Sequence, residues 1–236
     1  MHLGEDLRAA ATPQEASTRF FDKARSLGAT YLQTRLYRRP AARLTSATHW
    51  AAGGFITRIA PEAWPGSAAF NYVCFECNPL INAIRERRTR YRFSDFAPHG
   101  QRPYRNYWEA LGEADIGDAL CVTSYGSKGV ITSLHLGFGE TAVPAETAWG
   151  VQMAGLMLTE RLMEFSGGLA DDLPQLTPRE RDCLAFIADG KRDKEIAALL
   201  GIREVTVKFH IDNARKKLNA DNRAQAVARL VNRGVI

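Results

Sequence analysis

LTPRERDCLAFIADGKRDKEIAALLGIREVTVKFHIDNARKKL, residues 176–218, is the stretch that decides how the C-terminal part of the chain folds. Thr177 stands three residues before Glu180, which is the pattern of a capping box at the start of a helix. Pro178 suits the first turn of that helix, and Gly190 is placed to end it. The stretch therefore opens with a helix of about three turns.

A second helix follows after a short turn. Asp193 is in position to cap it, and Gly201 is in position to end it after residues 194–200. Two further helices are predicted at residues 204–218 and 223–232 from the spacing of their apolar residues. Two helices joined by a tight turn that contains glycine predict a helix-turn-helix domain, here built from four helices.

The third of these helices has two different faces. Its apolar residues recur at helical spacing and are expected to face inward: Val207, Ile211, Ala214 and Leu218. Lys208 and Asp212 lie on the opposite face, where we expect them to reach base edges in the major groove of DNA. Lys194, Thr206, Arg215 and Lys216 are expected to contact phosphates. The full set of candidate DNA-binding residues is Lys194, Thr206, Lys208, His210, Asp212, Arg215 and Lys216.

The charge of the chain is unevenly distributed. The net charge is +5, and residues 176–236 hold 13 Lys and Arg against 8 Asp and Glu, so this segment carries the whole excess. Residues 1–175 contain 18 basic and 18 acidic residues. Such an asymmetry indicates a polyanionic partner for the basic part, most often nucleic acid, although a solvated basic helix surface gives the same count.

Length and composition exclude several classes of protein. A chain of 236 residues with 45% hydrophobic and 24% charged residues is typical of a folded protein of one large or two modest domains. No apolar run approaches the roughly 18 residues of a membrane-spanning helix. The N-terminus also lacks the apolar stretch of a secretory signal, so we expect a cytoplasmic protein without membrane partners. Four cysteines spread over this length do not form a disulfide framework.

Residues 1–165 mix helical and strand patterns. The clearest element is a hairpin formed by residues 119–125 and 130–138, which flank a turn with two glycines. Asn78–Pro79 predicts the N-cap and the first helical position of a helix over residues 80–88.

A long helix over residues 145–165 closes this part of the chain. Its apolar residues are numerous enough that one face is expected to pack on a core or a partner. Residues 166–175, rich in small and polar residues, form the predicted linker. We therefore place a mixed α+β domain at residues 1–165 and an all-α domain, the predicted DNA-binding one, at residues 176–236.

The C-terminal residues resemble the LuxR-type helix-turn-helix domain. The matching positions are Leu176–Glu180, Leu184, Gly190, Lys194–Ala197, Leu200–Ile202, Thr206–His210 and Lys217–Leu218. This resemblance implies a transcriptional regulator that binds a dyad-symmetric promoter site as a homodimer. Arg192 and Arg203 stand where the family usually has serines before the second and third helices, which removes a cap and adds a cation at each position.

The order of elements in residues 15–165 resembles the autoinducer-binding domain of quorum-sensing regulators. This resemblance implies an α-β-α sandwich with a central antiparallel sheet. It also implies an acyl-homoserine lactone or another small lipophilic ligand between the sheet and one helical layer, with no other cofactor. A phosphoacceptor receiver is excluded because that domain begins with a strand, whereas this chain begins with a helix.

The positions that would contact such a ligand depart from the family's pattern. Asn78 stands where the family has aspartate, Phe93 where it has tryptophan, and His135 where it often has a small hydroxyl. Trp64 and Tyr72 lie near the family's upstream aromatic positions. The candidate ligand-binding residues are Trp64, Tyr72, Asn78, Phe93, Cys121 and His135, and a plain core role competes for Phe93 and Cys121.

Several alternatives stay open. The departures fit an unusual lipophilic ligand, a regulator that needs no ligand, or a lactone receptor with altered contacts. The alternative to a DNA-binding homodimer is an orphan regulator that acts by heterodimerisation with another receptor of the family. No nucleophile or phosphate-loop spacing is recognised, so no enzyme is predicted. Cys74 and Cys77 lack the further ligands that zinc needs, so they are expected to be core residues or a thiol switch, and no metal site is predicted.

Overall fold

The computed structural model describes residues 3–40, 43–168, 174–232 and 235–236. Within these ranges the chain forms two compact units. The first contains most of the residues up to 168, and the second contains those from 174 onward. Of the predicted linker, residues 169–173 lie outside the described ranges.

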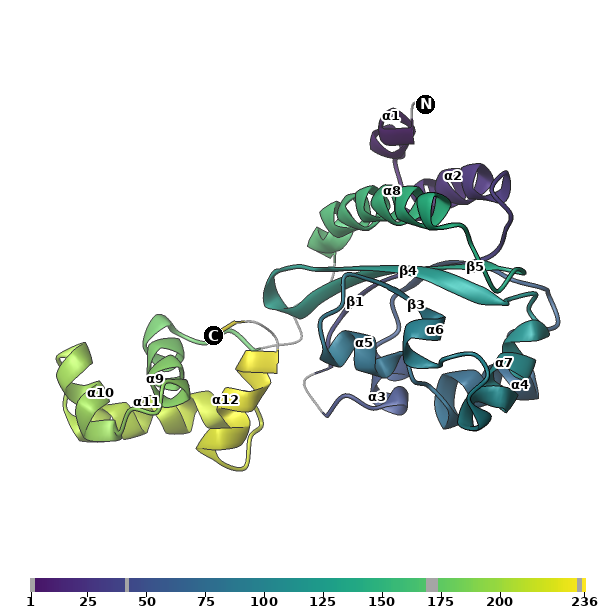
Figure 1. Ribbon diagram of the computed structural model, residues 1–236. Helices are drawn as coiled ribbons and strands as arrows, with labels where there is room; N and C mark the ends of the chain where they lie inside the picture. The colour runs from purple at the N-terminus through teal and green to yellow at the C-terminus, as the bar shows by residue number, and fades with distance from the viewer. Residues whose placement is uncertain (1–2, 41–42, 169–173, 233–234) are drawn as a thin grey trace. The chain divides into compact units, whose positions relative to one another are not determined.

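A five-stranded antiparallel sheet forms the middle layer of the N-terminal unit (Figure 1). The strands lie in the order β2-β1-β5-β4-β3. Their bounds are Ala29–Arg38 for β1, Phe55–Ile59 for β2, Arg90–Arg92 for β3, Asp118–Tyr125 for β4 and Val130–Phe138 for β5. The predicted hairpin is confirmed as β4 and β5, joined through a short turn, η3 (Ser127–Gly129).

Two helices cover one face of the sheet, α2 (Pro13–Arg25) and α8 (Ala145–Glu164), and α1 (Leu3–Arg8) packs on both of them on the side away from the sheet. Leu158 and Leu162 of α8 belong to the core on this face, together with residues of β4 and β5. At Gly155 a Cβ atom would come within 2.9 Å of Leu134 and Val122, so α8 rests directly on these two strands. Neither α8 nor any other helix of the described residues is long and apolar enough to cross a membrane.

Short helices and turns cover the other face of the sheet (Figure 1). They enclose a second core that contains Trp64, Tyr107 and Ile116. The unit is therefore an α-β-α sandwich, as predicted, and η4 (Phe165–Gly168) follows α8 at its end. The elements of the second layer are α3 (Ser46–Ala51), α4 (Ala68–Asn71), η1 (Tyr72–Glu76), α5 (Ile81–Arg85), α6 (Phe93–Phe96), η2 (Arg102–Tyr104) and α7 (Arg105–Gly112).

The helix predicted to begin at Asn78 begins later. The N-cap of α5 is Leu80, and its side chain makes no capping hydrogen bond. The Asn78 side chain instead donates a hydrogen bond from Nδ2 to the carbonyl oxygen of Cys74, at 3.1 Å. Because this bond holds the Asn78 amide toward the preceding turn η1, the first N–H groups of α5 do not reach it, and the predicted cap is wrong.

The C-terminal unit consists of α9 (Pro178–Ala188), α10 (Asp193–Leu200), α11 (Glu204–Lys217) and α12 (Arg223–Asn232). The predicted capping box is present at the start of α9. The Thr177 hydroxyl accepts a hydrogen bond from the backbone N–H of Glu180, and the Glu180 carboxylate accepts one from the backbone N–H of Thr177. Four short helices with their own apolar cores form this unit, which agrees with the predicted helix-turn-helix arrangement.

The start of α10 differs from the prediction. Its N-cap is Arg192, and the Glu195 carboxylate accepts a hydrogen bond from the Arg192 backbone N–H at 2.8 Å. Asp193 is therefore the first helical residue, and its carboxylate pairs with Arg223 of α12 at 2.9 Å. The predicted capping role of Asp193 is wrong, because its side chain ties α10 to α12 instead.

Candidate functional site

α11 has the two faces that its sequence predicts. Val207, Ile211 and Ala214 are buried. Lys208 and Asp212 lie on the other side, with 60% and 59% of their side chains exposed. The helix is thus anchored by its apolar stripe and leaves a polar face in solvent, where a large polyanion has room to approach.

Two ion pairs run along the exposed face of α11. The Lys208 ammonium lies 3.3 Å from the Glu204 carboxylate, and the Arg215 guanidinium lies 3.5 Å from the Asp212 carboxylate. Exposed pairs of this kind contribute only about 0.3 to 0.5 kcal/mol to stability. The two cations therefore exchange these carboxylates for phosphate or base-edge acceptors at little cost.

The other predicted DNA-binding residues lie on the same unit. Lys194 of α10 and Lys216 of α11 are exposed, whereas Thr206, His210 and Arg215 are half-buried. The structure thus brings the six predicted charged or hydrogen-bonding residues of α11 and one lysine of α10 onto the accessible surface of two consecutive helices. This arrangement suits contacts to both bases and phosphates.

Two exposed apolar residues of α11 were not predicted. Val205 is 64% exposed and Phe209 is 61% exposed. They lie four residues apart, so they sit on one side of the helix, outside its buried stripe. The signal in the sequence is that same spacing, because two large apolar residues that fall outside the inward stripe need a partner.

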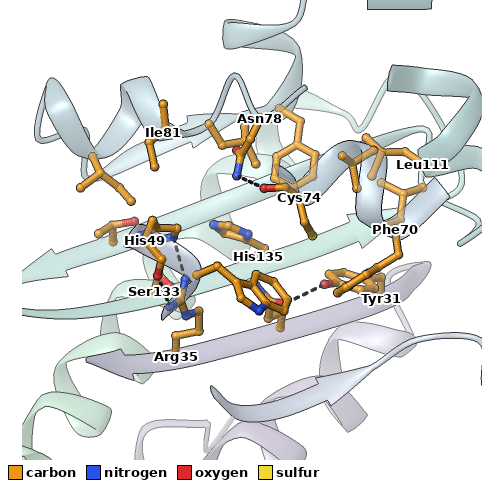
Figure 2. Close-up of a pocket in the computed structure, with 18 of the residues that line it drawn as sticks. Tyr31, Arg35, His49, Phe70, Cys74, Asn78, Ile81, Leu111, Ser133 and His135 are labelled. Carbon is orange, nitrogen blue, oxygen red and sulfur yellow. Dashed lines mark hydrogen bonds between the residues drawn. The ribbon is translucent and has the colours of Figure 1, made fainter. Parts of the chain in front are cut away.

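The N-terminal unit contains a cavity of about 80 Å³ between the sheet and the second helical layer (Figure 2). Four of the six predicted ligand-binding residues line it: Trp64, Asn78, Phe93 and His135. Trp64 donates a hydrogen bond from Nε1 to the carbonyl oxygen of Ala110 at 3.2 Å, so its ring is fixed in the wall. Asn78 keeps its side-chain carbonyl directed away from the bond to Cys74 and therefore retains an acceptor.

His135 stands on β5 beneath two aromatic residues. Its Nε2 lies 3.2 Å from the Tyr91 hydroxyl, and its ring meets Phe93 edge to face at 5.4 Å between ring centres. Burial, together with a smaller contribution from the nearby Arg35 guanidinium, lowers the pKa of His135 to about 4. The imidazole is therefore neutral at physiological pH, and it offers a hydrogen-bonding nitrogen rather than a charge.

Tyr72 and Cys121 do not line the cavity. Tyr72 opens the turn η1, where its side chain is half-buried against the outside of the second core. Cys121 pairs with His135 across β4 and β5 but is completely buried in that core, on the same strand as the lining residue Thr123. The structure therefore places both residues outside the lining of the cavity, in the second core or packed against it.

Arg35 and His49 line the cavity and were not predicted. Arg35 belongs to β1, on which Tyr31, Gln33, Arg35 and Tyr37 alternate with buried residues of the opposite face. Their alternation with apolar residues was visible in the sequence as a strand with a polar face toward the helices. The sequence did not show that this face is closed off from water.

Cys74 and Cys77 are both free thiols. Burial raises the pKa of the Cys74 thiol to about 11, so the reactive thiolate is scarce at neutral pH. No group of His, Cys, Asp and Glu in the described residues is arranged to hold a metal ion.

Known proteins resemble this chain at both levels, sequence and fold. The model of the family described as "Bacterial regulatory proteins, luxR family" matches residues 174–230. The transcriptional activator protein AhyR of Aeromonas hydrophila is 43% identical over 196 residues, which cover 75% of this chain and 71% of AhyR. The quorum sensing-dependent transcriptional regulator VjbR of Brucella abortus is 51% identical over 61 residues, which cover 26% of this chain and only 24% of VjbR.

Two solved structures share the fold. Escherichia coli SdiA superposes with a TM-score of 0.66, over 98% of this chain and 95% of that chain, at 22% identity. A structure of SdiA in complex with octanoyl-rac-glycerol gives the same TM-score at 20% identity, over 99% of this chain and 93% of that chain.

Proposed function

Because the chain belongs to the LuxR family of bacterial quorum-sensing regulators, we propose that it binds promoter DNA and regulates transcription in the cytoplasm. The observation that carries the proposal is the orientation of α11, whose apolar stripe is buried while Lys208 and Asp212 face solvent. A helix held in this way fits a major groove with its polar side chains against the bases. Family membership also supports a role without catalysis.

The regulator acts as a homodimer. A single short helix buries little surface on DNA, whereas two half-sites bound together multiply the affinity. The feature that supports dimerisation is a row of exposed apolar residues on α8: Trp149 is 62% exposed, Met153 37% and Met157 48%. They recur every four residues along one side of the helix and would bury most of their surface against a second copy.

The N-terminal unit acts as the sensor. The cavity that Trp64, Asn78, Phe93 and His135 line supports binding of a small lipophilic ligand. Named relatives include a quorum sensing-dependent regulator, and SdiA has been crystallised with octanoyl-rac-glycerol. An acyl-homoserine lactone is one candidate ligand, and action without a ligand is the alternative.

DNA binding is tested with the full chain and a promoter library, followed by anisotropy titration of the selected site. We expect binding to weaken as salt concentration rises, because released counterions contribute to affinity. Lys208→Ala is expected to reduce discrimination between selected and scrambled DNA by about tenfold. Arg105→Ala, which removes an exposed cation from the N-terminal unit, is the control. A chain that selects no sequence and binds DNA no more tightly at low salt contradicts the proposal.

The second candidate is a regulator that pairs with another receptor of the family instead of with itself. The same α8 row supports it, since an exposed apolar face accepts any complementary partner. Sedimentation of the purified chain separates the two candidates. A dimer that binds DNA alone supports the first, whereas a monomer that binds DNA only after a second LuxR-type receptor is added supports the second.

A further inference from the structure

Arg35 is an unusual residue for the wall of a lipophilic pocket. It is only 2% exposed, and no carboxylate of the described residues pairs with it. Its guanidinium donates to the carbonyl oxygens of Gly53 and His49, at 2.6 to 3.0 Å, and to His49 Nε2 at 2.7 Å (Figure 2). These bonds use four of its five N–H groups, and its charge remains uncompensated.

A second guanidinium lies beside the first. Arg58 of β2 donates from Nε to the side-chain Oε1 of Gln33 at 3.0 Å, while its Nη2 is buried and has no hydrogen-bond partner among the described residues. Arg35 and Arg58 stack on the same Phe55 ring, with their Cζ atoms 4.4 and 4.6 Å from its centre. Trp50 and Phe70, which line the cavity, also contact the Arg58 guanidinium.

The polar groups left over in this corner are donors. His49 Nε2 accepts a hydrogen bond from Arg35, so the neutral imidazole carries its proton on Nδ1, and that atom is buried with no hydrogen-bond partner in the part of the chain that the structure describes. Burial, together with a smaller contribution from the charge of Arg35, lowers the pKa of His49 to about 3. None of the residues that line the cavity is Asp or Glu. Arg35 and His49 line the cavity, and the Arg58 guanidinium packs on two of its lining rings without lining it itself. Two guanidinium groups and an imidazole N–H therefore lie in or directly behind the wall of a cavity whose lining residues carry no negative charge.

A buried cation without a counterion is costly, and proteins usually supply the counterion. The best acceptor for two guanidinium groups is a carboxylate, whose charge compensates theirs and whose two oxygens can accept from one N–H of each. A neutral lactone offers only carbonyl oxygens and leaves the charge uncompensated. The aromatic side chains around Arg58 favour a flat apolar body beside such a head group. The volume of about 80 Å³ favours a small one.

We propose that this pocket binds a small aromatic or short-chain carboxylic acid as its anion, with the carboxylate held by Arg35 and Arg58. The proposal rests on the sensor role of the N-terminal unit and names the chemical class of its ligand. His49 Nδ1 supplies a further donor to the carboxylate, and the rings of Trp50 and Phe70 pack against the body of the ligand.

The test uses the full chain and three carboxylates, each with its neutral amide: benzoate and benzamide, trans-cinnamate and cinnamamide, octanoate and octanamide. Binding is measured by calorimetry and by the rise in melting temperature, which follows ligand affinity by mass action. We expect at least one carboxylate to bind about tenfold or more tightly than its amide. Arg58→Gln removes that preference, and Arg35→Gln abolishes binding. Arg105→Gln removes an exposed charge from the same unit and serves as the control.

Arg35→Gln also removes the bonds to Gly53 and His49, so this variant tests the proposal only if its melting temperature shows that it folds. If it does not fold, Arg58→Gln tests the proposal instead, because Arg58 is half-exposed. Equal binding of acids and amides overturns the proposal, as does the absence of any binding by the three acids. A neutral acyl-homoserine lactone that binds equally to the original chain and to Arg58→Gln also overturns it. DNA binding is measured on the same samples, so a wrong ligand class is distinguished from a wrong regulatory function.

Discussion

Phe209 places an aromatic ring on the surface that we assign to DNA. An apolar side chain in the major groove gains most from the methyl group of thymine, which no other base presents. We expect Phe209→Ala to weaken binding to the selected site by roughly fivefold, within the range of a single apolar contact. Each thymine of the site is then replaced by uracil in turn. With the original chain, one of these replacements should lower the affinity as much as Phe209→Ala does, and the same replacement should not change the affinity of Phe209→Ala. Leu199→Ala, at an exposed leucine of α10, is the control. Equal responses of both variants to uracil would refute the contact.

His49 and His135 make the stability of the N-terminal unit depend on pH. Burial, together with Arg35, lowers their pKa values to about 3 and about 4, whereas the unfolded chain titrates near pH 6.5. The unfolded state therefore binds more protons below about pH 6.5. The contribution of the two neutral histidines to the free energy of unfolding is fully present above that pH. It falls as the pH drops toward 4, by up to about 1.4 kcal/mol per pH unit for each histidine.

His135→Gln is expected to reduce this dependence. Urea unfolding followed by tryptophan fluorescence, between about pH 7 and pH 5, measures it. The exposed His99 provides the control variant His99→Gln. If His135→Gln loses as much stability over this range as the original chain, the buried neutral histidine is not the cause.

The site residues show where sequence patterns succeed. Resemblance to a family pointed to Trp64, Asn78, Phe93 and His135, and all four line the cavity. Of these, only His135 stands on the sheet, in β5, and the other three come from the segments that cover the sheet. Arg35 was missed for a physical reason. Its burial depends on α3 and on the bend after it, whose carbonyl oxygens accept hydrogen bonds from the guanidinium. The spacing of residues within β1 does not indicate that a separate segment covers Arg35.

At the scale of elements, Glu180 joins the start of α9 to the end of α11. Its carboxylate accepts hydrogen bonds from the Thr177 backbone N–H and from Lys217 Nζ, both at 2.8 Å, and its side chain is 4% exposed. Burial raises the pKa of Glu180, but these hydrogen bonds and the Lys217 charge outweigh it, so the pKa is lowered overall. The contribution to stability is therefore present above about pH 4.5 and is lost as the pH falls below it.

Glu180→Ala is expected to lower the free energy of unfolding of the C-terminal unit by about 2 kcal/mol, since it leaves a cap and a charge-assisted bond unmade. Glu180→Gln keeps the shape of the side chain and should lower the free energy of unfolding by less. Hydrogen exchange of the α9 and α11 amides in the full chain measures the change. Asp182→Ala, on the same helix, is the control. Exchange rates that rise no more in Glu180→Ala than in Asp182→Ala would show that the link carries no stability.

Element prediction follows length. The β4–β5 hairpin, α8 and the four C-terminal helices repeat their apolar spacing often enough to be identified. The second helical layer consists of pieces such as α4, with 4 residues, and α6, with 4 residues, which are shorter than the period that identifies a helix. Asp193 shows the same limit at a helix end. Two acidic residues lie in the first turn of α10, and the ion pair of Asp193 with Arg223 leaves Glu195 to accept the hydrogen bond from the Arg192 backbone N–H.

For the whole molecule, the exposed row of α8 decides whether two copies act together. Trp149 and Met157 lie at its ends, with Met153 between them, while the opposite side of the helix is buried on the sheet. A symmetric dimer covers such a row with the same row of a second copy, because an isologous interface pairs one patch with itself.

Introducing two charges into that row, Trp149→Glu and Met157→Glu, places like charges in a desolvated contact, which opposes pairing strongly. We expect the double variant to sediment as a monomer with its melting temperature nearly unchanged, because neither residue belongs to the core. Affinity for a two-half-site operator should fall by about a hundredfold or more, whereas affinity for a single half-site stays as it was. Leu27→Glu, at an exposed apolar residue of the same unit outside the α8 row, is the matched control. If the double variant remains dimeric, the α8 row is not the interface. If it is monomeric yet binds the operator as tightly as the original chain, α11 acts alone and the dimer requirement is wrong.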